Sequence, residues 1–407
     1  MVQLFDMNRK LKHTITYIIL AAMLLTGLGG CATWDNFYKA FINPQQESSD
    51  IIRIAILEPL TGVDAKAASD EIAGIELANQ LFPSVLDKDV ELVYYDTKSN
   101  IEDLKEVTEK LTEEDISLVL GCYGNAMTIA AGDILREHFI PAIAITCTNP
   151  LITRTNPFYA RVCYIDLYEA AGAAEFVYSY LETDKVAVLT QRNNDYSKAK
   201  GEEFSARFSE LSGRDYIPVT AFDQESTDLE AILKSFSLAG SEVIYLPEDA
   251  DTSKRVMEKA KELALHFIWV GTSAWDGAGL DNVYFTVDYA ADEHQTPMTA
   301  EFNRAYTAKY GSDKTPPENA ALGFDAYLLA LRGISDARSV ISGSIIAMKI
   351  REVQDLEGAT GIIIMNEIGD PVKNIVINRS FDGKQTAVDT VAPTENSYYT
   401  NSTENSK

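Results

Sequence analysis

The chain has 407 residues, with 35 basic and 61 acidic side chains and a formal net charge of −26. Nucleic-acid binding needs a basic face, and adhesion to an anionic membrane surface needs basic clusters, so this charge argues against both functions. The length is more than one hydrophobic core usually supports, and it favours two domains.

The segment 1–30 has the organisation of a bacterial secretory signal. Basic residues at positions 9–12 precede an apolar run over 14–30, which is short for a membrane span and ends in two glycines before Cys31. This ending resembles the lipobox, in which the Cys is lipidated and becomes N-terminal. Two or three acyl chains on Cys31 would anchor the protein stably to the outer face of a bacterial cell membrane, or in a periplasm. The alternative is an uncleaved N-terminal helix with an incidental Cys.

Polar, aperiodic composition predicts a flexible tether over 31–50 and a disordered tail over 388–407. The body between them has an odd number of cysteines, so one disulfide is possible, but spacing does not identify its partners. These cysteines are Cys122, Cys147 and Cys163. No Cys-x-x-Cys or Cys/His metal pattern occurs, and neither a metal nor a cofactor is expected.

In the body, short runs rich in β-branched residues alternate with segments of helical periodicity. The first run predicts strands at 51–57, 90–95, 116–120 and 141–145, and helices at 69–82, from 100 onward and at 128–138. A second run predicts helices at 168–181, 198–211 and 252–265, and strands at 186–189, 243–246, 267–270 and 283–287. Helices at 301–310 and 320–334 follow, and then a hairpin of 361–365 with 372–377.

Alternating strands and helices predict parallel sheets covered by helices on both faces. Two successive runs therefore predict an α/β fold of two doubly wound parallel-sheet lobes. Because ligands of such sheets bind beyond the carboxyl ends of the strands, the loops that follow the strands are where a site is expected.

Several segments resemble those of one protein family and occur in the same order. They are 54–62 with Pro59-Leu60-Thr61-Gly62, Asp195-Tyr196-Ser197, 283–286, 320–326, 357–361 and 366–371. From residue 51 to about 383, the chain resembles the branched-chain amino-acid-binding proteins of ABC importers, which have the type I periplasmic-binding fold.

The resemblance implies two lobes joined by a three-strand hinge, with hinge strands near Asp166, Thr286 and Arg351. Lobe 1 would comprise 51–165 plus 287–349, and lobe 2 would comprise 166–286 plus 350–387.

The resemblance also implies site residues in the first lobe. Asn125 and Ala126 stand where the family uses hydroxyl residues for a ligand carboxylate, and free amides at a helix start favour the same group. Asn125 could instead only cap the helix. In the next loop, Thr146 takes the position that touches ligand through its backbone, and Thr148 the position that uses a hydroxyl. The alternative there is a turn cap before Pro150.

In the second lobe, Tyr196 resembles the aromatic residue that closes over the ligand, by its ring face or its hydroxyl. Ordinary interface packing is the alternative. Ser273 stands where many family members with amino-acid ligands carry an acid. Asp249, or Glu248, could restore that charge from a neighbouring loop, unless both belong to a solvated acidic loop.

The predicted function is a monomeric, lipid-anchored solute-binding protein that delivers an amino acid or amino-acid-like molecule to ABC permease subunits in the membrane. The alternatives are a ligand-sensing module of the same fold, or binding of a non-amino-acid carboxylate or amide. An enzyme is not predicted, because no Gly-x-Ser-x-Gly elbow or phosphate-binding Gly-x-x-x-x-Gly-Lys loop occurs.

Overall fold

A computed structural model describes residues 51–223, 228–291 and 296–392. The expected signal over 1–30, the lipidation site Cys31 and the tether over 31–50 lie outside these residues. Within the three ranges, no helix is both long enough and apolar enough to serve as a membrane span.

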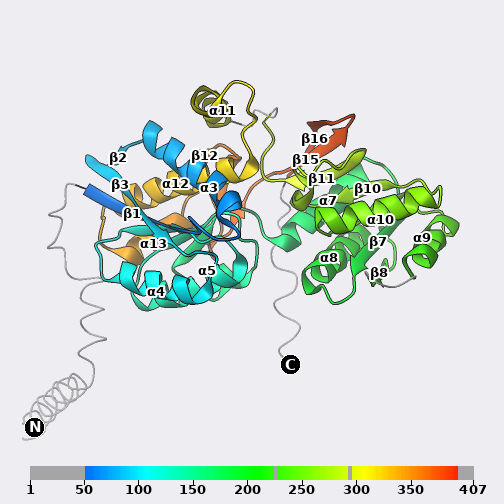
Figure 1. The fold of residues 1–407 in the computed structure, drawn as a ribbon, viewed down its shortest axis with the longest axis horizontal. Coiled ribbons are helices and arrows are strands. Elements are labelled where there is room, and N and C mark those ends of the chain that lie inside the picture. Colours follow the sequence, from blue (N-terminus) through cyan, green and yellow to red (C-terminus); the bar gives the residue numbers. More distant parts are fainter. Residues whose placement is uncertain (1–50, 224–227, 292–295, 393–407) are drawn as a thin grey trace, which may run out of the picture.

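The first lobe is built on a six-stranded sheet in the order β2-β3-β1-β4-β5-β6, parallel except for β2. Helices cover both faces (Figure 1), so the strands β4 and β5 are apolar and buried throughout. The strands are β1 (Ile51–Glu58), β2 (Ser84–Val85), β3 (Lys88–Asp96), β4 (Leu118–Gly121), β5 (Ala142–Ala144) and β6 (Tyr159–Arg161). The helices are α3 (Ala65–Leu81), α4 (Ile101–Thr112), α5 (Asn125–Glu137), α6 (Leu151–Arg154), α11 (Pro297–Tyr310), α12 (Glu318–Ala337) and α13 (Gly343–Arg351).

The second lobe lies beside the first and holds a seven-stranded sheet in the order β16-β15-β11-β10-β9-β7-β8 (Figure 1). Its strands are β7 (Val186–Gln191), β8 (Val219–Phe222), β9 (Val243–Tyr245), β10 (Ile268–Gly271), β11 (Val283–Val287), β15 (Ile375–Phe381) and β16 (Lys384–Val391). Its helices are α7 (Asp166–Ser179), α8 (Asp195–Ser212), α9 (Asp228–Leu238), α10 (Ala250–Glu262) and the short η1 (Ser273–Trp275). The predicted pair of doubly wound lobes is confirmed.

The end of the chain differs from the prediction in three places. Of the predicted hairpin of 361–365 with 372–377, only residues 371–372 pair with 364–365, while 375–377 belong to β15, which pairs with β11. The small sheet of β12 (Leu356–Gly358), β13 (Gly361–Met365) and β14 (Pro371–Val372) packs on the first lobe, because Ile363 and Met365 lie in the same core cluster as Ile54. The chain therefore leaves the first lobe near residue 372, not at 349 as expected. The tail prediction is wrong for 388–391, which belong to β16 and pair with β15.

Three connections join the lobes, and their side chains meet around one buried lysine. Lys373, after β14, pairs with Asp288, which follows β11, at 2.5 Å. Its Nζ also lies 5.8 Å from the ring centroid of Tyr164, which follows β6. Arg351 is not part of this hinge, because its guanidinium donates to the carbonyls of Asn156 and Tyr159 inside the first lobe.

Helices α3 and α12 touch backbone to backbone in the first lobe. A Cβ built on Gly323 would lie 2.1 Å from the carbonyl oxygen of Glu71, and one on Gly74 would lie 1.9 Å from the carbonyl oxygen of Ala320. The two glycines therefore set how closely α3, which carries Glu71, approaches the core.

We expect Gly323→Ala to destabilise the fold by about 1–3 kcal/mol despite the better helix propensity of Ala, because backbone atoms cannot move aside. Gly333→Ala on the same helix is the matched control, since the nearest atom that its Cβ would meet belongs to the side chain of Ile350 and not to the backbone. Urea unfolding of both variants measures the difference. Equal stability losses would show that the α3–α12 contact does not limit packing.

Candidate functional site

Each lobe has a point where the connections from two neighbouring parallel strands run in opposite directions. In the first sheet β1 lies between β3 and β4, and in the second β7 lies between β8 and β9. The loops after these strands leave a crevice at the carboxyl edge of an open α/β sheet, which is where ligands bind. All seven residues predicted from the sequence lie in loops or helix starts at these two edges.

In the first lobe, α5 begins directly after the β4 loop. Its first intrahelical bond runs from the amide of Thr128 to the carbonyl of Gly124, so the amides of Asn125 and Ala126 precede the helical ladder. The helix cap is Gly124 rather than Asn125. The Asn125 side chain instead accepts from the amide of Asn149 at 3.1 Å and ties the two predicted loops together.

A buried arginine shapes the loop that carries Thr146 and Thr148. Arg161 is fully buried, pairs with Asp370 at 2.7 Å, and donates to the carbonyls of Cys147 at 2.7 Å and Asn149 at 2.8 Å. Two of the carbonyls in the loop thus point toward the guanidinium. Thr148 is half-buried, and its hydroxyl makes no hydrogen bond within the described part of the chain.

Thr146 faces a pair of buried carboxyl groups. Its hydroxyl donates to Glu71 at 2.6 Å, and Glu71 is hydrogen-bonded to Glu58, the last residue of β1. Glu58 also accepts from the amide of Tyr123 in the β4 loop at 3.0 Å. Both glutamates are fully buried. The pair therefore connects the loops after β1, β4 and β5.

In the second lobe, buried Glu248 performs a similar bridging role after β9. It accepts from the backbone amide of Gln191 at the end of β7, from the Ser197 hydroxyl, and from the Asn194 side chain at 3.0 Å. Burial raises its pKa, while these donors act in the opposite direction. The start of α8 is fixed in this way, and with it Tyr196, whose side chain is 44% exposed.

Glu169 on α7 connects the other parts of the second-lobe site. It accepts from the amide of Ser273 at 2.8 Å and the hydroxyl of Thr286 at 2.6 Å, and it pairs with buried Lys200. Burial alone would raise the pKa of Glu169, but Lys200 and the other donors hold it below its ordinary value. The Lys200 ammonium lies 4.3 Å from the ring centroid of Tyr196. One face of that ring is therefore already occupied by a cation.

The geometry does not support the prediction that Asp249 supplies a charge missing at Ser273. Asp249 caps α10, and its two oxygens accept from the amide and the hydroxyl of Thr252, each at 2.8 Å. The carboxyl group of Glu248 likewise already accepts hydrogen bonds from donors within the second lobe. The acidic groups nearest to a predicted ligand contact are instead Glu71, behind Thr146, and Glu169, behind Ser273.

We call the ligand-side loops of each lobe a half-site. The two half-sites are close along the chain. Arg161, which shapes the first-lobe loop, is five residues from Asp166, which pairs with Lys200 at 3.1 Å in the second lobe. Five residues span at most about 17 Å even when fully extended. The sequence therefore keeps both half-sites near the same connection between the lobes.

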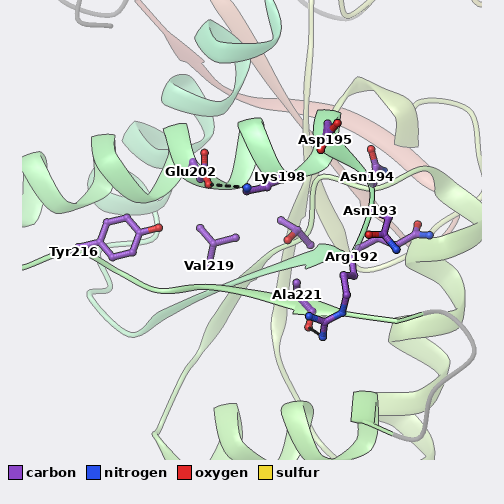
Figure 2. Close-up of a pocket in the computed structure, with 11 residues that line it drawn as sticks. Arg192, Asn193, Asn194, Asp195, Lys198, Glu202, Tyr216, Val219 and Ala221 are labelled. Atoms are coloured by element: carbon purple, nitrogen blue, oxygen red, sulfur yellow. Dashed lines mark hydrogen bonds and ion pairs between the residues drawn. The ribbon is translucent and has the colours of Figure 1, made fainter. Parts of the chain in front are cut away.

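A hollow of about 360 Å³ lies elsewhere, between α8 and the edge strand β8 (Figure 2). Arg192, Lys198 and Tyr216 line it, and Arg192 is paired with Asp223 at 3.0 Å. None of the seven predicted residues lines this hollow. It is a second place where a small molecule could lie.

The sequence did not reveal the buried groups that position the predicted residues: Glu58, Glu71, Arg161, Glu169, Lys200 and Asp370. Their partners lie far away in sequence, 209 positions in the case of Arg161 and Asp370. A Glu at the end of β1 and a Lys on the buried side of α8 were the available signals. Cys122, Cys147 and Cys163 are buried and not in disulfides.

A family model described as periplasmic binding protein matches residues 51–377. Leu/Ile/Val-binding protein homolog 1 of Brucella abortus is 23% identical over 142 residues, and the match spans 34% of this chain and only 37% of that relative. The structure of a leucine-binding protein from Thermotoga maritima is 28% identical, with a TM-score of 0.70 over 84% of this chain and 99% of that one.

A more distant solved structure shares the fold alone. It is an ABC-transporter solute-binding protein from R. palustris in complex with benzoate, with 17% identity and a TM-score of 0.66. The alignment covers 84% of this chain and 97% of that one. Proteins of this architecture therefore include one named for leucine and one that holds a carboxylate without an amino group.

We expect Arg161→Met to destabilise the fold by about 3–5 kcal/mol, because it leaves the Asp370 carboxylate buried without its partner. Arg53→Met is the matched control. Its pair with Glu91 is exposed, at 37% and 51% for the two side chains, so its loss should cost about 0–1 kcal/mol. Denaturant unfolding compares the two. A small and equal loss would contradict the assigned role of Arg161.

Proposed function

Because the chain belongs to the periplasmic binding protein family, we propose that it is an extracytoplasmic solute-binding protein of an ABC importer, with an amino-acid-like ligand held between its two lobes. The observation that carries this proposal is the pair of half-sites at the carboxyl edges of the two sheets, anchored on residues 161 and 166 at either end of one connection. Ligand release to permease subunits would follow from opening of the lobes about the three connections.

The ligand site comprises both edges. Thr148 and the amides of Asn125 and Ala126 receive the carboxylate, because they offer donors at a helix start. Thr146 contacts the other polar end of the ligand. From the second lobe, the Tyr196 hydroxyl and the outer face of its ring close over the ligand, with Ser273 beside them. Binding involves no chemical conversion, so the ligand should be recovered unchanged.

The anchoring at Cys31 belongs to the same proposal. The basic and apolar residues before Cys31 support lipidation at this position, and a tether over 31–50 would let the lobes reach the permease. The protein would act as a monomer at the outer face of the cell membrane.

A second candidate ligand is a small carboxylate without an ammonium group. Two observations favour it: Ser273 replaces the acid that many amino-acid-binding relatives carry, and the R. palustris structure contains benzoate. A thermal-shift screen with the common L-amino acids, their amides and benzoate compares the two classes. At a ligand concentration of 100 times Kd, a binder should add about 2.7 kcal/mol of stability.

We expect Thr148→Ala and Tyr196→Ala each to weaken the best ligand of that screen about tenfold or more, since each removes a hydrogen bond to a charged group or a closing contact. Tyr216→Ala is the matched control, because Tyr216 lines the hollow between α8 and β8 and is 61% exposed. Isothermal titration calorimetry provides the dissociation constants. If only Tyr216→Ala weakened ligand binding, the ligand would lie in that hollow and the proposed site would be wrong.

A further inference from the structure

The hydrogen atom of the Thr146 hydroxyl is already used inside the protein. A hydroxyl has one hydrogen to donate, and here it points to Glu71 Oε1 at 2.6 Å. The Thr146 oxygen can then offer only lone pairs toward a ligand. A carboxylate offers only lone pairs as well, so the group that binds at Thr146 must be a hydrogen-bond donor.

Behind Thr146, the two buried carboxyl groups depend on each other. Within the described residues, no donor other than the neighbouring carboxyl group reaches Glu58 Oε1 or Glu71 Oε2. Two carboxyl oxygens can approach each other only with a proton between them. One of the two carboxyl groups must therefore donate its proton to the other.

No cation of the described chain forms an ion pair with Glu58 or Glu71. The charge of Arg161, which shapes the first-lobe loop, is matched by Asp370. The other titratable groups that act on the pair, or feel its charge, are all neutral or acidic. They are Asp70 on α3, Cys122 and Tyr123 after β4, Cys147 after β5, and Tyr159 on β6.

We propose that Glu71, paired with Glu58, is a specificity-determining residue that selects ligands bearing an ammonium group through the hydroxyl oxygen of Thr146. The inference rests on the proposed function, because it takes the solute to lie against Thr146. It assigns to the first lobe the negative charge that Ser273 does not supply in the second lobe. It also chooses amino acids over plain carboxylates as the substrate class.

The arrangement predicts that ligand binding releases a proton. Burial raises the pKa of Glu71 to about 8, although the hydrogen bonds from Thr146 and Glu58 oppose the shift. The ligand-free pair therefore holds its protons below that pH, and a nearby ammonium favours the ionised form. Affinity for ammonium ligands should consequently rise with pH toward about 8, by at most about tenfold per pH unit.

The test uses pairs of probes that differ only in the amino group. They are leucine with 4-methylpentanoate, valine with 3-methylbutanoate, and phenylalanine with 3-phenylpropanoate, together with the other common L-amino acids. Calorimetry in two buffers of different ionisation enthalpy counts released protons, at a pH from about 6 to 7.5 so that the ligand ammonium stays charged. We expect amino acids to bind more tightly than their partners and to release a proton.

Two nearly isosteric variants separate charge from fold. Glu71→Gln still accepts from Thr146 but removes the titrating group, so amino-acid affinity should fall about tenfold while binding of the deaminated acids is unchanged. Glu58→Gln leaves Glu71 and its hydrogen bond from Thr146 in place, so the preference for amino acids over deaminated acids should be retained. Glu76→Gln, on the exposed face of α3, is the matched control for both.

Three results would overturn the inference: a deaminated acid that binds as tightly as its amino-acid partner, an equal effect of Glu71→Gln on both members of a pair, or amino-acid binding without proton release in the unmodified protein. The proton-release measurement uses the unmodified protein, so it does not depend on whether a variant folds. If no probe binds at all, the proposed function itself fails, and the inference falls with it.

Discussion

In each lobe, a buried glutamate joins the two loops that diverge at the edge of the sheet. Glu58 at the end of β1 accepts from the amide of Tyr123 after β4, and Glu248 after β9 accepts from the amide of Gln191 at the end of β7. Diverging connections leave backbone donors that no sheet ladder can satisfy, and a buried donor without a partner costs about 1–3 kcal/mol. The carboxyl groups meet this constraint and hold the ligand-side loops in place.

The two lobes balance their buried acids in different ways. In the second lobe Lys200 pairs with both Glu169 and Asp166, and its charge keeps the pKa of Glu169 low. In the first lobe, Glu58 and Glu71 are hydrogen-bonded to each other, burial raises the pKa of both, and neither has a paired cation among the described residues. A solute with an ammonium group would place a cation near the two glutamates of the first lobe. The second lobe would contact the solute through the Tyr196 ring, whose other face lies against the Lys200 ammonium. The absence of an acid at Ser273 is then compatible with an amino-acid ligand.

The sequence predicted the lobes because their strands are compact apolar runs, such as β1 and β9, between amphipathic helices. It missed β8, whose first three residues are only partly buried, and it placed the second half of β16 in a disordered tail because that edge strand is polar. The loops of the site were predicted because each follows a strand, in an order of strands and helices that resembles that of the family. Their supports, such as Arg161 with Asp370, were not found, since pairing across distant sequence follows from packing and not from local pattern.

If the loop ends of both sheets bind one solute, a crystal structure of the protein with its best amino-acid ligand should show it between them. We expect a ligand carboxylate about 3 Å from the Thr148 hydroxyl and the first amides of α5, and an ammonium about 3 Å from the Thr146 oxygen, with Tyr196 against the ligand. A ligand bound between α8 and β8, or on one lobe without contact to the other, would contradict this expectation.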